Sequence, residues 1–309
     1  MGRLGRYERA MNVIVDRNSE VTRDFSRDEA VLLIHGLGGT RNDLGNLRKK
    51  LATDGRQVYD LLLPGHGGTP DDLRDIDCDV WIDAVQRKVS ELRSVYTTVH
   101  VLGLCMGALL ALETAKRGLI GGNGRDRLVL LAPPVFLDGW SLPWYRAIRH
   151  LVYRIPLLAQ AIRIRESFPF GVKNRRVRGM VQRKLQCDER FHYSWVPLRS
   201  IRELDRLRTR ALADIERITC PTLIVHALDD ELTSVRSAQY LRDRINSAQN
   251  APPAQLRILS DSYHMICIDN ERDHVAGHVQ EFLAPAEFEC PRATSRSRNH
   301  NRVSNEVTG

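Results

Sequence analysis

The sequence predicts an α/β protein with a mostly parallel central sheet, flanked by helices and carrying an inserted helical cap. Short apolar runs of strand length alternate with stretches of helical periodicity, and this alternation stops after Pro134 and resumes at Cys220. The predicted strands are almost wholly apolar, as expected for a parallel sheet that is covered on both faces. A chain of 309 residues is long enough for one such domain with an insertion.

The first part of the predicted core contains four strands and three helices. The strands are residues 31–34, 58–63, 99–103 and 128–131, and glycine-rich turns follow the first two of them. Helical spacing of apolar residues predicts helices at 43–54 and 80–96, and an Ala- and Leu-rich stretch predicts a third at 108–116. The order strand–helix–strand predicts parallel neighbours joined by crossover helices.

The second part of the core follows a long interruption. A strand at 222–225, a helix at 234–246, a strand at 255–259 and a helix at 273–283 resume the alternation. The sequence therefore divides into an N-terminal segment (1–29), a core (30–134 and 220–284), a basic helical cap insertion (135–219) and a polar tail (285–309) that we expect to be disordered.

Composition excludes several other classes of protein. No apolar run reaches the ~18 residues that a membrane-spanning helix needs, and the first 20 residues lack the apolar stretch of a secretory signal. The six cysteines show neither pairing nor a Cys-x-x-Cys spacing, which argues against disulfides and against a zinc site. We therefore expect a cytoplasmic protein without a metal or another cofactor.

The most informative segment is Gly103-Leu104-Cys105-Met106-Gly107, which lies between a predicted strand and a predicted helix. It matches the nucleophile-elbow pattern G-x-S-x-G, with cysteine at the serine position. Such a turn is strained and needs small residues two positions on either side of the nucleophile. It also places the sulfur at a helix N-terminus, where a thiolate is favoured. The pentapeptide alone fits a buried structural cysteine about equally well.

Three further segments favour a catalytic role. His35-Gly36-Leu37-Gly38-Gly39 ends an earlier strand, where the backbone N–H groups of Leu37 and Met106 could form an oxyanion hole. Asp229 and Asp230 follow a later strand, and His264 follows the last strand. Nucleophile, acid and histidine thus occur in the chain order of elbow enzymes, which other triad folds do not share.

These motifs resemble those of the α/β-hydrolases, and within them the bacterial carboxylesterase and monoacylglycerol-lipase-like group, over about residues 30–284. The resemblance implies Cys105 as nucleophile, Asp230 as acid and His264 as base, with Leu37 and Met106 as oxyanion donors. Alignment with the family's G-x-x-D loop selects Asp230 and leaves Asp229 as the alternative. The sequence departs from this group at the nucleophile, because the group normally has serine in the elbow. An elbow with cysteine resembles those of dienelactone hydrolases and polyhydroxyalkanoate synthases.

The predicted function is hydrolysis of carboxylic esters or thioesters through a Cys-His-Asp triad and an acyl-enzyme intermediate. Because the acyl group on Cys105 is a thioester, it also passes to thiols, amines or alcohols, so an acyltransferase that uses an acyl thioester donor is an alternative. A second alternative is a catalytically silent binding protein with the same fold.

The cap insertion carries an excess of positive charge. Between Trp140 and Arg210 there are 17 Lys and Arg but only 5 Asp and Glu, in a chain with a net charge of +8. One interpretation is an ordinary cap helix whose apolar stripe roofs the pocket; the other is an apolar acyl tunnel with a cationic rim. That rim would attract an anionic donor or a lipid surface, while nucleic-acid binding is not expected. The stripe comprises Trp144, Ile148, Leu151, Val152 and Ile155.

Overall fold

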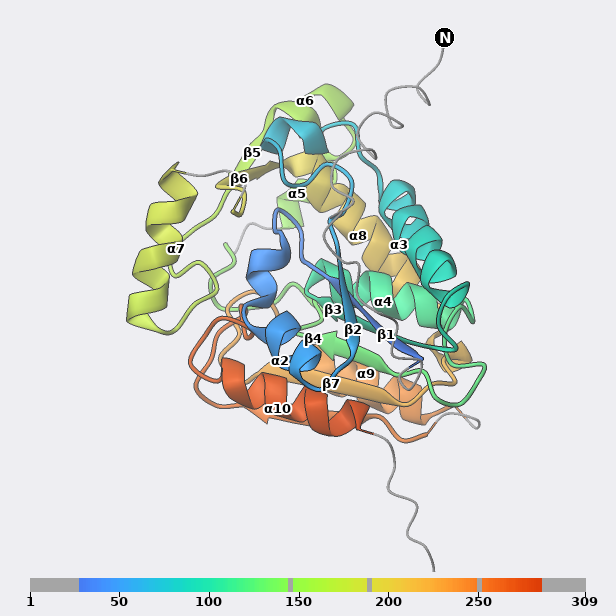
Figure 1. Cartoon of the computed structure of the whole chain (residues 1–309). Coiled ribbons are helices and arrows are strands. Elements are labelled where there is room, and N and C mark those ends of the chain that lie inside the picture. The colour runs from blue at the N-terminus through green and yellow to red at the C-terminus, as the bar shows by residue number, and fades with distance from the viewer. Residues whose placement is uncertain (1–27, 144–146, 188–190, 249–251, 285–309) are drawn as a thin grey trace, which may run out of the picture.

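The computed structural model describes residues 28–143, 147–187, 191–248 and 252–284 (Figure 1). The predicted disordered tail (285–309) and almost all of the predicted N-terminal segment (1–29) lie outside these described residues, as do Trp144, Arg146 and Cys290.

A six-stranded sheet forms the centre of the protein, and its strands lie in the order β2-β1-β3-β4-β7-β8. Every neighbouring pair in this sheet is parallel, as the apolar strands predict. The strands are β1 (Glu29–Ile34), β2 (Gln57–Leu61), β3 (Thr98–Leu104), β4 (Leu128–Leu131), β7 (Thr222–Ala227) and β8 (Gln255–Leu259).

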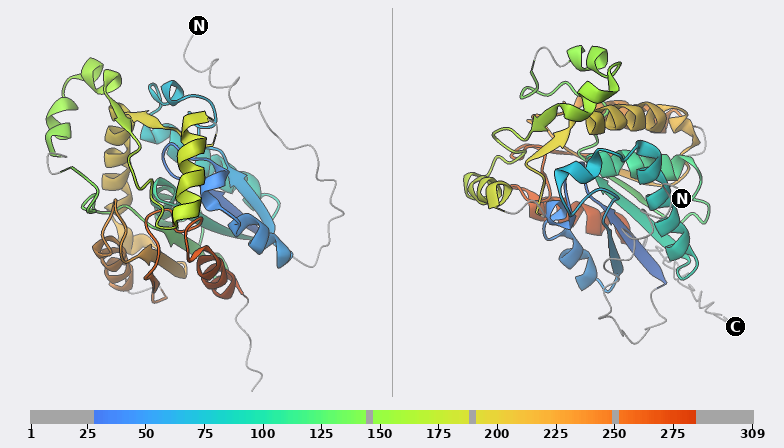
Figure 2. Two further views of the ribbon diagram at one scale, coloured as in Figure 1. Left: turned by 90° about the vertical axis from the view of Figure 1, so that its left-hand side faces the viewer. Right: turned by 90° about the horizontal axis from the view of Figure 1, so that it is seen from above.

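Helices cover both faces of the sheet (Figures 1 and 2). Alternate residues of β1 point to opposite faces, so Leu32 and Ile34 pack in one hydrophobic cluster while Val31 and Leu33 pack in the other. The first cluster includes residues of α3 (Cys78–Arg93), α4 (Met106–Lys116), α8 (Leu198–Leu212) and α9 (Arg236–Asn246). The second includes residues of α2 (Leu47–Thr53) and α10 (Arg272–Leu283).

The strand order places a topological switch point beside β1. The chain runs from β1 to β2 on one side, and β3 then pairs with β1 on the other side. In open α/β sheets, ligands bind outside the carboxyl ends of the strands at such a point. The segments that leave β1 and β3 here are the His35–Gly39 turn and the cysteine elbow.

The predicted elements of the core are present, with one interruption. The helix predicted at 43–54 is divided into a short 3₁₀ turn, η1 (Arg41–Leu44), and α2. Gly45 separates them with φ of 56°, a left-handed value that a continuous α-helix does not allow.

The cap insertion combines helices with two short strands. It contains α5 (Arg149–Val152), α6 (Pro156–Ala161), α7 (Arg175–Cys187) and an antiparallel pair, β5 (Arg163–Arg165) with β6 (Trp195–Pro197). The last helix of the predicted insertion, α8, instead packs along α4 and α3 and buries Leu204 and Leu207 in the core. Among the described residues, no helix is both long enough and apolar enough to cross a membrane.

Candidate active site

Cys105 occupies the turn between β3 and α4, and its backbone is strained. Its φ of 54° and ψ of −117° lie outside the regions that non-glycine residues normally adopt. The turn is fixed by two hydrogen bonds of 2.9 Å: Cys105 N–H donates to the carbonyl of Leu131, and Ala108 N–H donates to the carbonyl of Cys105. The half-buried side chain lines a pocket above the sheet.

The glycines on either side of the elbow are required by close backbone approach. A Cβ on Gly103 would lie 2.0 Å from the carbonyl oxygen of Gly107. A Cβ on Gly107 would lie 2.2 Å from the carbonyl oxygen of Ile34 in β1. Both distances are far inside van der Waals contact with rigid backbone, so no larger residue fits the turn as it stands.

The structure brings His264 and Asp230 together. The Nδ1 of His264 lies 2.8 Å from Oδ2 of Asp230, and the other carboxylate oxygen accepts from the backbone N–H groups of Leu232 and Thr233. Burial by itself raises the pKa of Asp230, but the charge of His264 and its hydrogen bond lower it below its usual range. Asp229 instead points outward and forms an ion pair with Lys173 at 2.9 Å.

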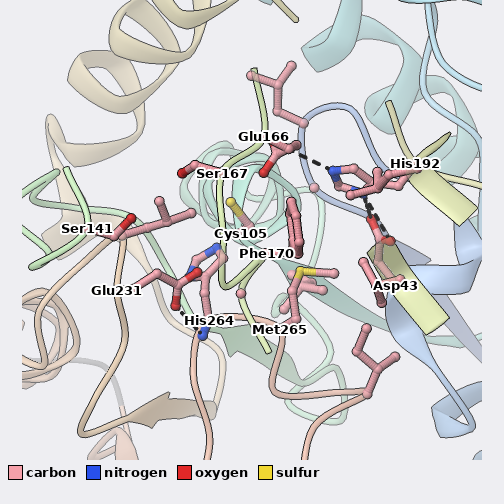
Figure 3. Close-up of a pocket in the computed structure, with 18 of the residues that line it drawn as sticks. Asp43, Cys105, Ser141, Glu166, Ser167, Phe170, His192, Glu231, His264 and Met265 are labelled. Atoms are coloured by element: carbon pink, nitrogen blue, oxygen red, sulfur yellow. Dashed lines mark hydrogen bonds and ion pairs between the residues drawn. The ribbon is translucent and has the colours of Figure 1, made fainter. Parts of the chain in front are cut away.

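The ring of His264 lies next to the Cys105 side chain in the pocket (Figure 3). Its Nε2 is buried and has no well-aligned hydrogen bond to another described residue. Burial by itself lowers the pKa of His264, but the Asp230 carboxylate and the neighbouring Cys105 side chain raise it well above its ordinary value. Catalytic hydrogen bonds are commonly long in unliganded enzymes and tighten when substrate binds.

The two predicted oxyanion donors lie at the same edge of the sheet. Met106 opens α4, where the first N–H groups have no acceptor within the helix, and Leu37 N–H has no acceptor among the described residues. The turn that carries Leu37 is held by two buried histidines. His35 Nε2 accepts from Leu63 N–H, and His66 Nε2 accepts from Gly38 N–H, which ties this turn to the one after β2.

The apolar wall of the pocket differs from the one suggested by the sequence. It is formed mainly by α7 and the loops around it, with Val181, Leu185, Phe170 and Phe191. The interpretation that the apolar stripe of residues 144–155 roofs the pocket is wrong for the described members, because none of them lines the pocket. Ile148, Leu151 and Ile155 are instead 53–61% exposed. The helix there is a single turn, since Ile155 precedes Pro156 and adopts an extended conformation.

Sequence reasoning assigned no role to Glu231, which also lines the pocket. Its side chain is buried, and its Oε2 accepts a hydrogen bond of 3.0 Å from the backbone N–H of His264. Burial raises the pKa of Glu231 to about 7. The position next to Asp230 was the only signal in the sequence.

A partly buried ion pair lies across the pocket and was also missed (Figure 3). His192 Nδ1 lies 3.1 Å from Oδ2 of Asp43, and its Nε2 lies 3.8 Å from Oε1 of Glu166. Burial by itself lowers the pKa of His192, but these carboxylates raise it well above its ordinary value. Residues 191–193 are hydrogen-bonded to the turn that carries Leu37, which we call the oxyanion turn. Tyr193 N–H donates to Gly38 O at 2.8 Å, and the Thr40 hydroxyl donates to Phe191 O at 2.9 Å.

The remaining described cysteines have no comparable surroundings. Cys78, Cys220 and Cys267 are buried, Cys187 is exposed, and all of them are free thiols. Burial raises the pKa of both Cys220 and Cys267 to about 12, so these thiols are poor nucleophiles. Within the described ranges, no group of three or more His, Cys, Asp or Glu side chains has the arrangement of a metal site.

Comparisons with known proteins agree with this architecture. The sequence model of the Alpha/beta hydrolase family matches residues 31–276. The thermostable monoacylglycerol lipase of Bacillus sp. (strain H-257) is 25% identical over 259 residues, which is 82% of this chain and 90% of the relative. The carboxylesterase of Bacillus subtilis (strain 168) is 22% identical over 257 residues, which is 83% of this chain and 92% of the relative.

Solved structures show the same fold. The monoacylglycerol lipase of Paleococcus ferrophilus superimposes with a TM-score of 0.66 at 18% identity, covering 82% of this chain and 93% of that one. A soluble variant of the monoglyceride lipase of Saccharomyces cerevisiae gives a TM-score of 0.66 at 16% identity, covering 83% and 86% of the two chains. The fold class predicted from the alternation of strands and helices and from the elbow is thereby confirmed.

Proposed function

We propose that this chain, which belongs to the Alpha/beta hydrolase family, cleaves carboxylic esters or thioesters through an acyl-enzyme on Cys105. His264 acts as acid and base, and Asp230 orients it and stabilises its protonated form. The backbone N–H groups of Leu37 and Met106 receive the developing oxyanion. The observation that carries the proposal is that Cys105 and His264 line one pocket at the sheet's carboxyl edge, while the buried Asp230 contacts the other ring nitrogen of His264.

The names of the relatives support an ester substrate. Two are called a monoacylglycerol lipase and a carboxylesterase, and both align over more than four fifths of this chain. The apolar wall formed by Val181, Leu185, Phe170 and Phe191 offers a place for an acyl chain. We therefore propose that the acyl group lies against α7 while its carbonyl carbon faces Cys105.

The thiol nucleophile broadens the set of acyl acceptors. The Cys105 thiolate attacks the carbonyl, the leaving group departs with the proton of His264, and a thioester remains on the enzyme. Water then releases the acid, with His264 taking the proton of the water. An alcohol, amine or second thiol in place of water would make the same site an acyltransferase, which is the second candidate function. The retained Asp230–His264 pair argues against a silent binding protein.

An acyl probe and a substrate panel test this proposal together. We expect a fluorophosphonate or thiol-directed acyl probe to modify the Cys105 peptide, as read by mass spectrometry. We expect p-nitrophenyl esters and acyl thioesters to turn over in the same preparation. Adding alcohol or amine acceptors then separates hydrolysis from transfer, because a transferase yields the acylated acceptor instead of the free acid. Labelling elsewhere in the chain, with Cys105 unmodified, would contradict the proposal.

A lipid surface is the partner that we propose for the cap insertion. Four apolar residues in and next to α5 and α6 are 41–61% exposed, and they form what we call the α5–α6 apolar surface: Ile148, Leu151, Ile155 and Leu158. Arg154 is exposed within it, and the insertion as a whole is strongly basic. Exposed apolar side chains beside cations match an anionic membrane interface, where both kinds of contact add up.

Vesicle binding tests this partner. We expect the protein to sediment with phosphatidylglycerol vesicles more than with phosphatidylcholine vesicles, and less so in high salt. The double variant Leu151→Gln/Ile155→Gln should weaken binding about tenfold, because two apolar side chains no longer enter the interface. The matched control is Val95→Gln, an exposed apolar residue just after α3. Equal binding of all forms, with salt-sensitive turnover of coenzyme A thioesters, would indicate a soluble anionic donor instead.

A further inference from the structure

Glu231 is a second buried carboxylate at the candidate active site, and it takes no part in the proposed acyl-enzyme mechanism. Its side chain is 3% exposed, and its Oε2 is 3.0 Å from the backbone nitrogen of His264. Its own backbone carbonyl accepts a hydrogen bond of 3.1 Å from Ser141 N–H in the cap insertion. One hydrogen bond thus holds the carboxylate and another holds the backbone of Glu231, and this residue lines the same pocket as Cys105.

The position of this charge matters because it acts on the imidazole. A carboxylate near a histidine favours the imidazolium form, and the effect is large where water is excluded. Burial raises the pKa of Glu231 to about 7, although the charge of His264 acts in the opposite direction. Glu231 therefore becomes ionised as the pH rises through about 7, where an ordinary histidine has already lost its proton.

A thiol enzyme and a serine enzyme need opposite resting states of this histidine. A thiolate nucleophile rests beside an imidazolium, which must keep its proton until it delivers it to the leaving group. A serine nucleophile needs a neutral imidazole that can accept the hydroxyl proton. An extra negative charge beside the ring therefore favours the first chemistry and opposes the second at neutral pH.

We propose that Glu231 is a positioning residue that holds His264 in place and keeps its imidazole protonated opposite the Cys105 thiolate. This inference rests on the proposed function, because it assumes Cys105 as nucleophile.

Other charged groups near His264 must stay constant for this effect to be seen. Asp230 keeps its three hydrogen bonds when Glu231 is replaced by glutamine, since none of them involves Glu231. Glutamine also keeps an oxygen that can accept from His264 N–H, so the substitution removes charge and preserves shape. The other titratable or charged groups around the pair are Cys105, His226, Asp229 with Lys173, and Asp43, His192 and Glu166 across the pocket.

The test is Glu231→Gln in two backgrounds, the wild-type chain and Cys105→Ser, assayed with an alkyl ester whose leaving group needs a proton. Removing a negative charge lowers the pKa of His264 in both, by about one pH unit. In the thiol enzyme we expect the alkaline limb of kcat/KM to move to lower pH, which reduces activity at pH 8. In the serine variant we expect the acid limb to move to lower pH, which raises activity between pH 7 and 8, where the Glu231 carboxylate of the parent chain is ionised.

A second readout does not depend on turnover. Nuclear magnetic resonance of ¹³C-labelled histidine gives the pKa of His264 directly in each variant. The matched control is Glu203→Gln, because Glu203 is also buried but pairs with Arg202 and Arg206 on α8, away from the pocket. We expect no shift of the His264 pKa in that control.

Two outcomes distinguish an error in the role of Glu231 from an error in the choice of nucleophile. If Glu231→Gln lowers thermal stability but leaves the His264 pKa and both pH limbs unchanged, Glu231 has a purely structural role and this inference is wrong. If Cys105→Ala keeps wild-type turnover, the proposed nucleophile is wrong, whatever the histidine titration shows.

Discussion

Replacing Cys105 with alanine should lower kcat by about 10⁴- to 10⁶-fold, because the only nucleophile of the proposed mechanism is then missing. Binding of substrate should change little, since the pocket walls from α7 and the surrounding loops remain. The substitution removes one sulfur atom from a half-buried position, so we expect the fold to persist. Steady-state kinetics with a p-nitrophenyl ester and circular dichroism measure the two effects.

The matched control for this variant is Cys187→Ala. Cys187 is an exposed free thiol at the end of α7, and its removal should leave kcat and labelling at position 105 within about twofold of wild type. Wild-type turnover in Cys105→Ala, with loss in another cysteine variant, would assign the chemistry to a different residue.

Replacing Asp230 with asparagine should reduce kcat by about 10²- to 10⁴-fold. The carboxylate fixes Nδ1 of His264 as the protonated nitrogen at 2.8 Å, and its charge stabilises the imidazolium. An amide at this position removes that charge and presents an N–H group that favours the wrong tautomer. Since the lowered pKa of Asp230 keeps it ionised down to acidic pH, the loss should be similar across the neutral range.

Asp229→Asn distinguishes the two adjacent carboxylates that the sequence offered as triad acid. The side chain of Asp229 is half exposed and pairs with Lys173, so we expect kcat within about threefold of wild type. The opposite ranking, with Asp229→Asn more damaging than Asp230→Asn, would reverse the assignment of the acid. Measuring both variants with one substrate is sufficient.

The sequence predicted the parts of the fold that depend on local patterns. Each strand of the sheet is a short and mostly apolar run that alternates with helices, so the parallel pairing and the edge that carries Cys105 followed from residues close together in the chain. The elbow could also be predicted from the sequence, because other backbone atoms approach Gly103 and Gly107 so closely that only glycine fits at these positions.

Features that depend on contacts between distant segments could not be predicted in this way. Asp43 and His192 meet across 149 positions of sequence, and neither belongs to a recognisable motif. The role of α8 was missed for a related reason: its apolar face shows helical spacing but does not say that α4 is its partner. The exposure of the α5–α6 apolar surface was missed because the expected single helix over these residues is divided between α5 and α6, with Ile155 extended before Pro156.

The hydrogen bonds between residues 191–193 and the oxyanion turn have a consequence for protein engineering. Insertions are an obvious unit to exchange between members of this family when a new specificity is wanted. Here a grafted insertion would leave the carboxylate of Asp43 buried without its cation, beside the turn that carries Leu37. A working chimera should therefore carry the donor's residue at position 43 together with its insertion.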